Sequence, residues 1–150
     1  MQCQPDPFAM LMAHRTMGSL YFMVGNFRAS YTHKAKGLAL YSLQLHPQQQ
    51  TYDYNFHDAG AACYVYMVLS LWMLGYPDQA LCKLQEALVV ARERARPYRL
   101  AWVLFVAAHL HQYRGEAQSV YEHTEASISL AREQSFSYHL GHAVMVQGWR

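Results

Sequence analysis

The stretch that most restricts the fold lies near the middle of the chain and reads Leu71-Trp72-Met73-Leu74-Gly75-Tyr76-Pro77-Asp78-Gln79-Ala80-Leu81. Apolar residues leading into it recur at three- and four-residue intervals, which is typical of one broad helical face. Gly75 can end that helix, because glycine takes the left-handed conformation of a helix C-terminus without a Cβ penalty. Pro77 can begin the next helix, because the first helical position has no use for the missing N–H. The stretch therefore predicts a helix hairpin with almost no loop.

Two further glycines stand in the same relation to an apolar helical pattern. Gly25 lies 50 residues before Gly75, and Gly115 lies 40 residues after it. A period of this order is typical of stacked helix pairs rather than of a closed globule. We therefore expect structural corners at Gly25, at Gly75 with Pro77, and at Gly115.

The periodicity along the rest of the chain predicts an all-α protein with seven helices and no strands. We expect one domain over residues 1–150, with hairpins at about 8–45, 58–95 and 97–135 and a half repeat at 137–150. Residues 46–57 form the one long connection, and Asp58 can cap the helix that follows. The last helix is apolar where a terminal helix should be polar, which indicates a longer array or self-association.

Composition limits the kinds of partner. Hydrophobic residues make up 53% of the chain and charged residues only 15%, so part of the surface is expected to meet a protein, a peptide or an adjoining domain. A net charge of +2 is too small to indicate nucleic acid. The basic run of Arg92, Arg94, Arg96 and Arg99 is interpreted as a solvated helix end in preference to an anion site.

The cysteines and the first residues bear on location. Cys3, Cys63 and Cys82 have no metal-type spacing and cannot all pair, so we expect reduced, mostly buried thiols. The start of the chain is polar and broken by proline, and no apolar run reaches membrane-spanning length. These features predict a cytoplasmic protein that does not enter a membrane.

No residue pattern indicates catalysis, a cofactor or a metal. A phosphate-binding loop with the pattern G-x-x-x-x-G-K-[ST] does not occur. His109 and His111 lie on different helix faces, and His139 and His142 lack a nearby cysteine or carboxylate at ligand spacing. We therefore expect a protein that is not an enzyme and binds neither cofactor nor metal.

Residues 62–149 resemble a tetratricopeptide-type array, specifically the long-helix repeats of predicted multidomain ATPases and of class III adenylate/guanylate cyclase fusions. The resemblance rests on the central stretch quoted above, on Gln85-Glu86-Ala87-Leu88, on Ala107-Ala108-His109-Leu110-His111-Gln112 and on Gly148-Trp149. Gly75, Ala80 and Ala87 match the small positions where paired helices touch, whereas Val120 and Ser127 depart from them in the next repeat. The resemblance implies a regulatory or scaffold segment attached to a signalling ATPase or cyclase.

The tetratricopeptide register also implies a groove. The residues expected to line it are Met12, Arg15, Phe22, Val65, Leu69, Trp72, Trp102, Phe105, His109 and Gln112. Such a groove would bind a peptide or helix through a few anchors, but the same aromatics could instead pack on neighbouring helices. Small-molecule sensing in a closed pocket between helices is the alternative function.

The corner hypothesis makes one stability comparison. Gly75→Val should lower the free energy of unfolding by on the order of 1–3 kcal/mol, because valine is strained at positive φ. The same change at Gly60, expected in the loop, should matter less.

Overall fold

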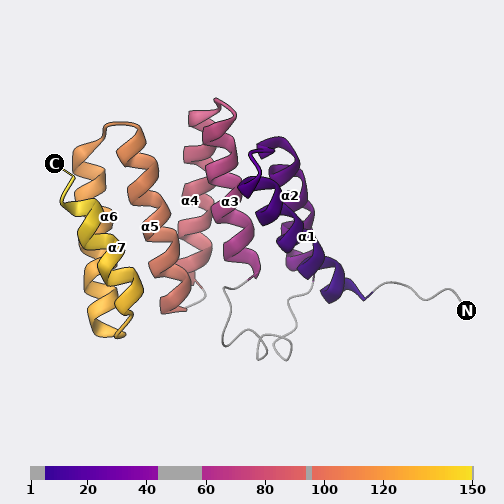
Figure 1. The fold of residues 1–150 in the computed structure, drawn as a ribbon. Helices are drawn as coiled ribbons and strands as arrows, with labels where there is room; N and C mark the ends of the chain where they lie inside the picture. The colour runs from indigo at the N-terminus through magenta and orange to yellow at the C-terminus, as the bar shows by residue number, and fades with distance from the viewer. Residues whose placement is uncertain (1–5, 44–58, 94–95, 150) are drawn as a thin grey trace, which may run out of the picture. The chain divides into compact units, whose positions relative to one another are not determined.

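The computed structural model describes residues 6–43, 59–93 and 96–149, and these residues form helices joined by short corners without any strand. The predicted all-α fold class with seven helices is confirmed (Figure 1). The helices are α1 (Pro7–Met23), α2 (Phe27–Leu43), α3 (Ala59–Met73), α4 (Pro77–Glu93), α5 (Pro97–Tyr113), α6 (Ala117–Glu133) and α7 (Ser137–Gln147). The expected roles of Asp58, Cys3 and Arg94 fall outside the described residues.

Local chemistry explains where these helices begin. The Asp6 side chain accepts a hydrogen bond from the Phe8 N–H at 3.1 Å, and Asn26 Oδ1 accepts one from the Ala29 N–H at 3.1 Å. Both bonds satisfy backbone donors that have no partner within the first helical turn. Proline is the first residue of α1, α4 and α5, where its fixed φ suits the helix.

Three corners share one hydrogen-bond pattern. The Gly25 N–H bonds the Phe22 carbonyl at 3.0 Å, and the Asn26 N–H bonds the Tyr21 carbonyl at 2.9 Å. This is the Schellman arrangement, which satisfies the last carbonyls of a helix when its end residue has positive φ. Gly75 and Gly115 repeat both bonds. The φ angles are +80° at Gly25, +83° at Gly75 and +73° at Gly115.

The corner between α6 and α7 has the same geometry without a glycine. Ser135 has a φ of +58°, and the Phe136 N–H bonds the Ala131 carbonyl at 2.8 Å. A non-glycine residue is held in the left-handed region here because the hydrogen bonds and the packing of both helices require the turn.

The chain divides into two compact units, residues 1–83 and 84–150, with the division inside α4. In the first unit, α2 packs against both α1 and α3, and α1 also contacts α3. In the second unit, α6 packs against both α5 and α7, and α5 also contacts α7. Within each unit, consecutive helices therefore pack as in a helical solenoid, and successive first helices of the hairpins touch.

A buried lysine lies at the centre of the first unit. The side chain of Lys34, on α2, is fully buried, and its Nζ donates hydrogen bonds to the Arg15 carbonyl at 2.6 Å and to Ser19 Oγ at 2.8 Å. Nζ also lies 4.3 Å from the centre of the Tyr66 ring on α3. Burial lowers the pKa of Lys34 to about 8. The amine thus links α1, α2 and α3 through polar contacts.

Two sequence expectations are wrong in this unit and its neighbour. Gly60 is not a loop residue: it lies in α3, and a Cβ built on it would come within 2.5 Å of the Tyr41 ring. Arg99 does not belong to a solvated face, because it is only 4% exposed. Both errors arise because a neighbouring helix, which local periodicity does not identify, decides what a position contacts.

The two described cysteines differ in burial. Cys63, on α3, is buried, and burial raises the pKa of its thiol to about 11. Cys82, on α4, is exposed, so the expectation of mostly buried thiols holds for only one of them.

Candidate interaction site

The site that the sequence predicts is a line of side chains on the first helix of each hairpin. On α5 that line has a clear structural form, because Trp102, Phe105, His109 and Gln112 are each half-buried while every other residue between 101 and 112 is buried. Spacings of three and four residues place all four side chains along one edge of the helix. The four residues, called the α5 stripe below, are the only accessible part of this stretch of α5.

Aromatic contacts fix the middle of the α5 stripe. The Phe105 ring lies 4.3 Å from the His109 ring and 5.0 Å from the His142 ring of α7, centre to centre. His109 Nδ1 donates a hydrogen bond to the Phe105 carbonyl at 3.1 Å. Burial lowers the pKa of His109, and the nearby His142 lowers it further, although the hydrogen bond to Phe105 acts in the opposite direction. The stripe is therefore held rigid and favours a neutral imidazole.

The candidate residues of the first unit lie on α1 and α3. Met12, Arg15, Phe22, Leu69 and Trp72 are half-buried, whereas Val65 is 3% exposed and offers little surface. Phe22 packs edge-on against the Tyr66 ring of α3 at 5.3 Å, and Arg15 Nη1 lies 3.9 Å from Met12 Sδ. These side chains thus pack between helices and also remain partly exposed to solvent. Whether they continue the α5 stripe as one groove stays a prediction.

Histidines form pairs at several helix contacts. His14 Nδ1 lies 2.9 Å from His33 Nδ1 between α1 and α2, and the His111 ring stacks on His123 at 5.1 Å between α5 and α6. Within the described ranges, no group of three or more His, Cys, Asp or Glu residues could hold a metal ion. A pair alone leaves a transition metal short of the four protein ligands typical of structural sites.

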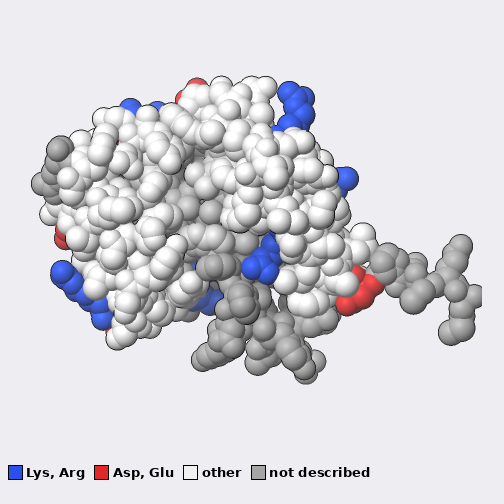
Figure 2. All heavy atoms as spheres, in the orientation of Figure 1, with Lys and Arg blue, Asp and Glu red and all other residues white. Residues whose placement is uncertain are grey.

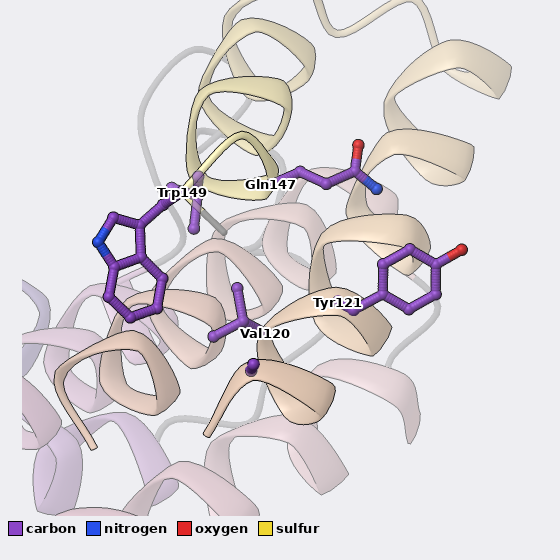
Figure 3. A pocket seen from close by; sticks show the side chains of 6 residues that line it. Val120, Tyr121, Gln147 and Trp149 are labelled. Carbon is purple, nitrogen blue, oxygen red and sulfur yellow. The ribbon is translucent and has the colours of Figure 1, made fainter. Parts of the chain in front are cut away.

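An open pocket lies at one end of the α6–α7 pair (Figure 3). The space it encloses is about 10 Å³, which is about the room that one water molecule needs and far too little for a small-molecule ligand. The lining is mostly apolar, with Trp149 and Tyr121 at opposite sides in Figure 3. The residues that line it are Ala117, Val120, Tyr121, Val146, Gln147 and Trp149. It does not have the enclosed form that the small-molecule alternative requires.

Charge is sparse on the face drawn in Figure 2. Lysine, arginine and acidic side chains are scattered there and gather into no patch. Nucleic-acid surfaces present clustered positive charge because phosphate contacts dominate the affinity. The face shown therefore lacks the electrostatic signature of such a surface.

Comparison with protein families decides the class of the chain. The model of the family described as anaphase-promoting complex subunit 5 matches residues 31–102 and 94–147, which together cover more than half of the sequence. The chain belongs to this family. The anaphase-promoting complex subunit 5 family has tetratricopeptide-like helical repeats, so that part of the sequence resemblance is confirmed. No curated protein matches the chain.

The two matches to anaphase-promoting complex subunit 5 overlap at residues 94–102, where α5 begins. The family is one of protein-complex subunits built from helical repeats, which is consistent with protein partners and with a non-catalytic scaffold. Among the residues that the structure describes, no helix is both long and apolar enough to cross a bilayer.

Proposed function

We propose that this chain is a non-catalytic scaffold that recognises another protein through the half-buried edges of its first helices. The observation that carries the proposal is the α5 stripe, in which Trp102, Phe105, His109 and Gln112 form a continuous edge on a stretch of α5, residues 101–112, that is otherwise buried. Tryptophan and other aromatics contribute most to protein interfaces, because a large ring is buried at a small cost in side-chain entropy.

Family membership supports the same proposal. The family is named for a subunit of a complex, and helical repeats present extended surfaces on which partners bind. We propose that residues 1–150 act as one repeat domain within a longer array and that Met12, Arg15, Phe22, Leu69 and Trp72 extend the recognition surface. Attachment to a signalling ATPase or cyclase and a cytoplasmic location stay predictions.

The test is the composition of the assembly that contains the chain. We would isolate the tagged protein from its own cells and quantify the co-purifying subunits by mass spectrometry, for the natural chain and for Trp102→Ala. We expect Trp102→Ala to lower the partner yield at least tenfold, since an anchor residue contributes about 2 kcal/mol or more.

Tyr121→Ala is the matched control. Tyr121 is also a large aromatic residue, but it lies on α6 away from the α5 stripe and is 41% exposed. Circular dichroism would establish that both variants remain helical. Recovery of the natural chain without any stoichiometric partner, or equal yields for the two variants, would contradict the proposal.

A further inference from the structure

Two histidines of the first hairpin meet where α1 and α2 pack together. His14, on α1, and His33, on α2, are 19 residues apart in the chain, and their Nδ1 atoms lie 2.9 Å from each other. The two rings are 5.1 Å apart, centre to centre, and are tilted by 44°. Because the lone pair of a ring nitrogen lies in the plane of its ring, two tilted rings can direct both lone pairs at one point. The two nitrogen atoms are therefore arranged as a pair of metal ligands would be.

The packing around the two rings holds them in this arrangement. Gly37 lies one turn after His33, and a Cβ built on it would come within 3.6 Å of His14 Cβ, so the two helices approach closely beside the pair. The Tyr21 ring, two turns after His14, stacks on the His33 ring with centres 5.3 Å apart. Both histidines are half-buried. The pair is therefore positioned by its neighbours and still reaches solvent.

A second histidine pair shows that contact between two rings is not enough. His111 and His123 also lie 5.1 Å apart, but their rings are stacked with an angle of only 18° between the planes. Nearly parallel rings direct their lone pairs side by side and not at one point. The Nδ1 atom of His111 is also bonded to Glu116 at 2.5 Å. This second pair is therefore a matched control for the first.

The distance between the two nitrogen atoms selects the kind of ion. A bond from a metal to an imidazole nitrogen is about 2.0–2.1 Å long, so two nitrogens 2.9 Å apart subtend roughly 90° at one ion. Right angles between neighbouring ligands are typical of the square-planar and tetragonal coordination of Cu²⁺ and Ni²⁺, both of which bind imidazole well. Tetrahedral Zn²⁺ would require a wider angle.

Both Nδ1 atoms can become ligands without a change in the charge of the rings. A neutral imidazole carries its one proton on either nitrogen, so moving that proton to Nε2 frees the lone pair of Nδ1. Burial lowers the pKa of His33, and His14 and Lys36 lower it further. The positive charge of Lys36 opposes a metal cation as it opposes a proton, so a bound ion should exchange readily.

We propose that His14 and His33 bind one Cu²⁺ or Ni²⁺ ion through their two Nδ1 atoms, with water at the remaining coordination positions. Two protein ligands make this an exchangeable site and not a structural one, which would have four. Because the ion binds the folded hairpin and joins α1 to α2, it should stabilise the first unit by mass action. The pair belongs to the first unit and shares no residue with the α5 stripe, so failure of this proposal would leave the proposed function standing.

The probe is Ni²⁺, which thiols do not reduce, added to the full chain without an affinity tag. Isothermal titration calorimetry measures the dissociation constant, and thermal unfolding measures the shift in melting temperature. We expect one ion to bind the natural chain and to raise its melting temperature. His14→Gln and His33→Gln should each weaken binding by at least about tenfold, since even a change next to a metal ligand costs about 10–100-fold. His123→Gln should bind Ni²⁺ as the natural chain does.

A second measurement uses the natural chain alone and so does not depend on the folding of a variant. Six-coordinate Ni²⁺ is paramagnetic, so in a proton–nitrogen NMR spectrum of the histidine rings a substoichiometric amount should broaden the signals of His14 and His33 before those of His111 and His123. Broadening that begins at other histidines would overturn the proposal. So would the absence of a rise in melting temperature, or equal affinity in the natural chain and both glutamine variants, which would mean an adventitious ion only.

Discussion

The backbone of Gly18 lies directly against the side chain of Lys34. A Cβ at position 18 would come within 2.7 Å of Lys34 Cε and within 2.8 Å of its Cγ and Cδ. The lysine stem is fully buried, so it has no free space into which it could retreat. Gly18 on α1 therefore makes the room that a buried lysine on α2 needs.

Gly18→Ala should destabilise the first unit by about 1–3 kcal/mol, because overpacking a filled core forces side chains or helices apart. The measurement is the free energy of urea unfolding. Gly141→Ala is the control, since both glycines are helical but position 141 is open. A Gly18→Ala chain as stable as the natural one would mean that Lys34 is not fixed in this position.

Lys34 should make the stability depend on alkaline pH. Burial lowers its pKa in the folded chain from 10.5 to about 8, so between these values the unfolded chain binds the proton more readily. Lys34 should then contribute a rise in stability between pH 8 and 10.5 of up to about 3 kcal/mol, at about 1.4 kcal/mol per pKa unit, which the raised pKa of Cys63 opposes above pH 9. Lys34→Met should remove this rise. The difference between the two chains in urea unfolding at pH 7.5 and 10 measures it, and equal slopes would contradict it.

Ser135→Gly should stabilise the chain by roughly 0.5–1 kcal/mol. Serine at a φ of +58° is strained, whereas glycine is not, and the relief exceeds the extra backbone entropy that glycine adds to the unfolded chain. Thermal unfolding measures the change. Ser137→Gly, two residues on and at the start of α7, should destabilise instead, and a gain from both variants would point to another cause.

Gly60 and Gly141 should respond in opposite directions to alanine. At Gly60 the added methyl group would meet the Tyr41 ring at 2.5 Å, so Gly60→Ala should cost about 1–3 kcal/mol. At Gly141 nothing lies within 4 Å, so alanine should gain up to about 1 kcal/mol from its better helix propensity. Melting temperatures of the two variants give the comparison. A Gly60→Ala chain that melts at or above the natural temperature would contradict the α2–α3 contact.

His123 should reduce stability in mild acid. Burial lowers its pKa below 6.5 in the folded chain, and the neighbouring His111 and Arg92 lower it further. The unfolded chain then binds the proton more readily, so the stability falls as the pH drops from 6.5 towards the folded value. His123→Phe keeps an aromatic ring and should lessen the fall between pH 7 and 5 in urea unfolding. An unchanged fall would assign it to other groups.

Glu116 affects the stability in a lower pH range than His123 does. Its carboxylate accepts hydrogen bonds from His111 at 2.5 Å and from Arg114 at 2.7 Å, and these contacts hold its pKa below 4.5. Its contribution is therefore present above pH 4.5 and is lost as the pH falls through the folded value. The loss due to His123 begins two pH units higher, so the two effects can be told apart.

The sequence by itself determined the helices and their class. Apolar spacing, a proline at a helix start and a glycine at a helix end act within a few residues, and hydrogen bonds between neighbours such as Gly25 and Phe22 are enough to realise them. The spacing that puts the α5 stripe along one edge of a helix is local in the same way, whereas its half-burial is not. Such features depend on the local chain and so can be read from it.

Only the tertiary structure decided which positions are buried and which are exposed. Lys34 is buried because Gly18, on another helix, leaves room for its stem, and Gly60 is critical because Tyr41 lies against it. Val144 on α7 is exposed, whereas Leu104, 40 residues earlier on α5, is buried. The physical reason is that burial depends on neighbours supplied by other helices, and these are set by packing across distances that local periodicity does not encode.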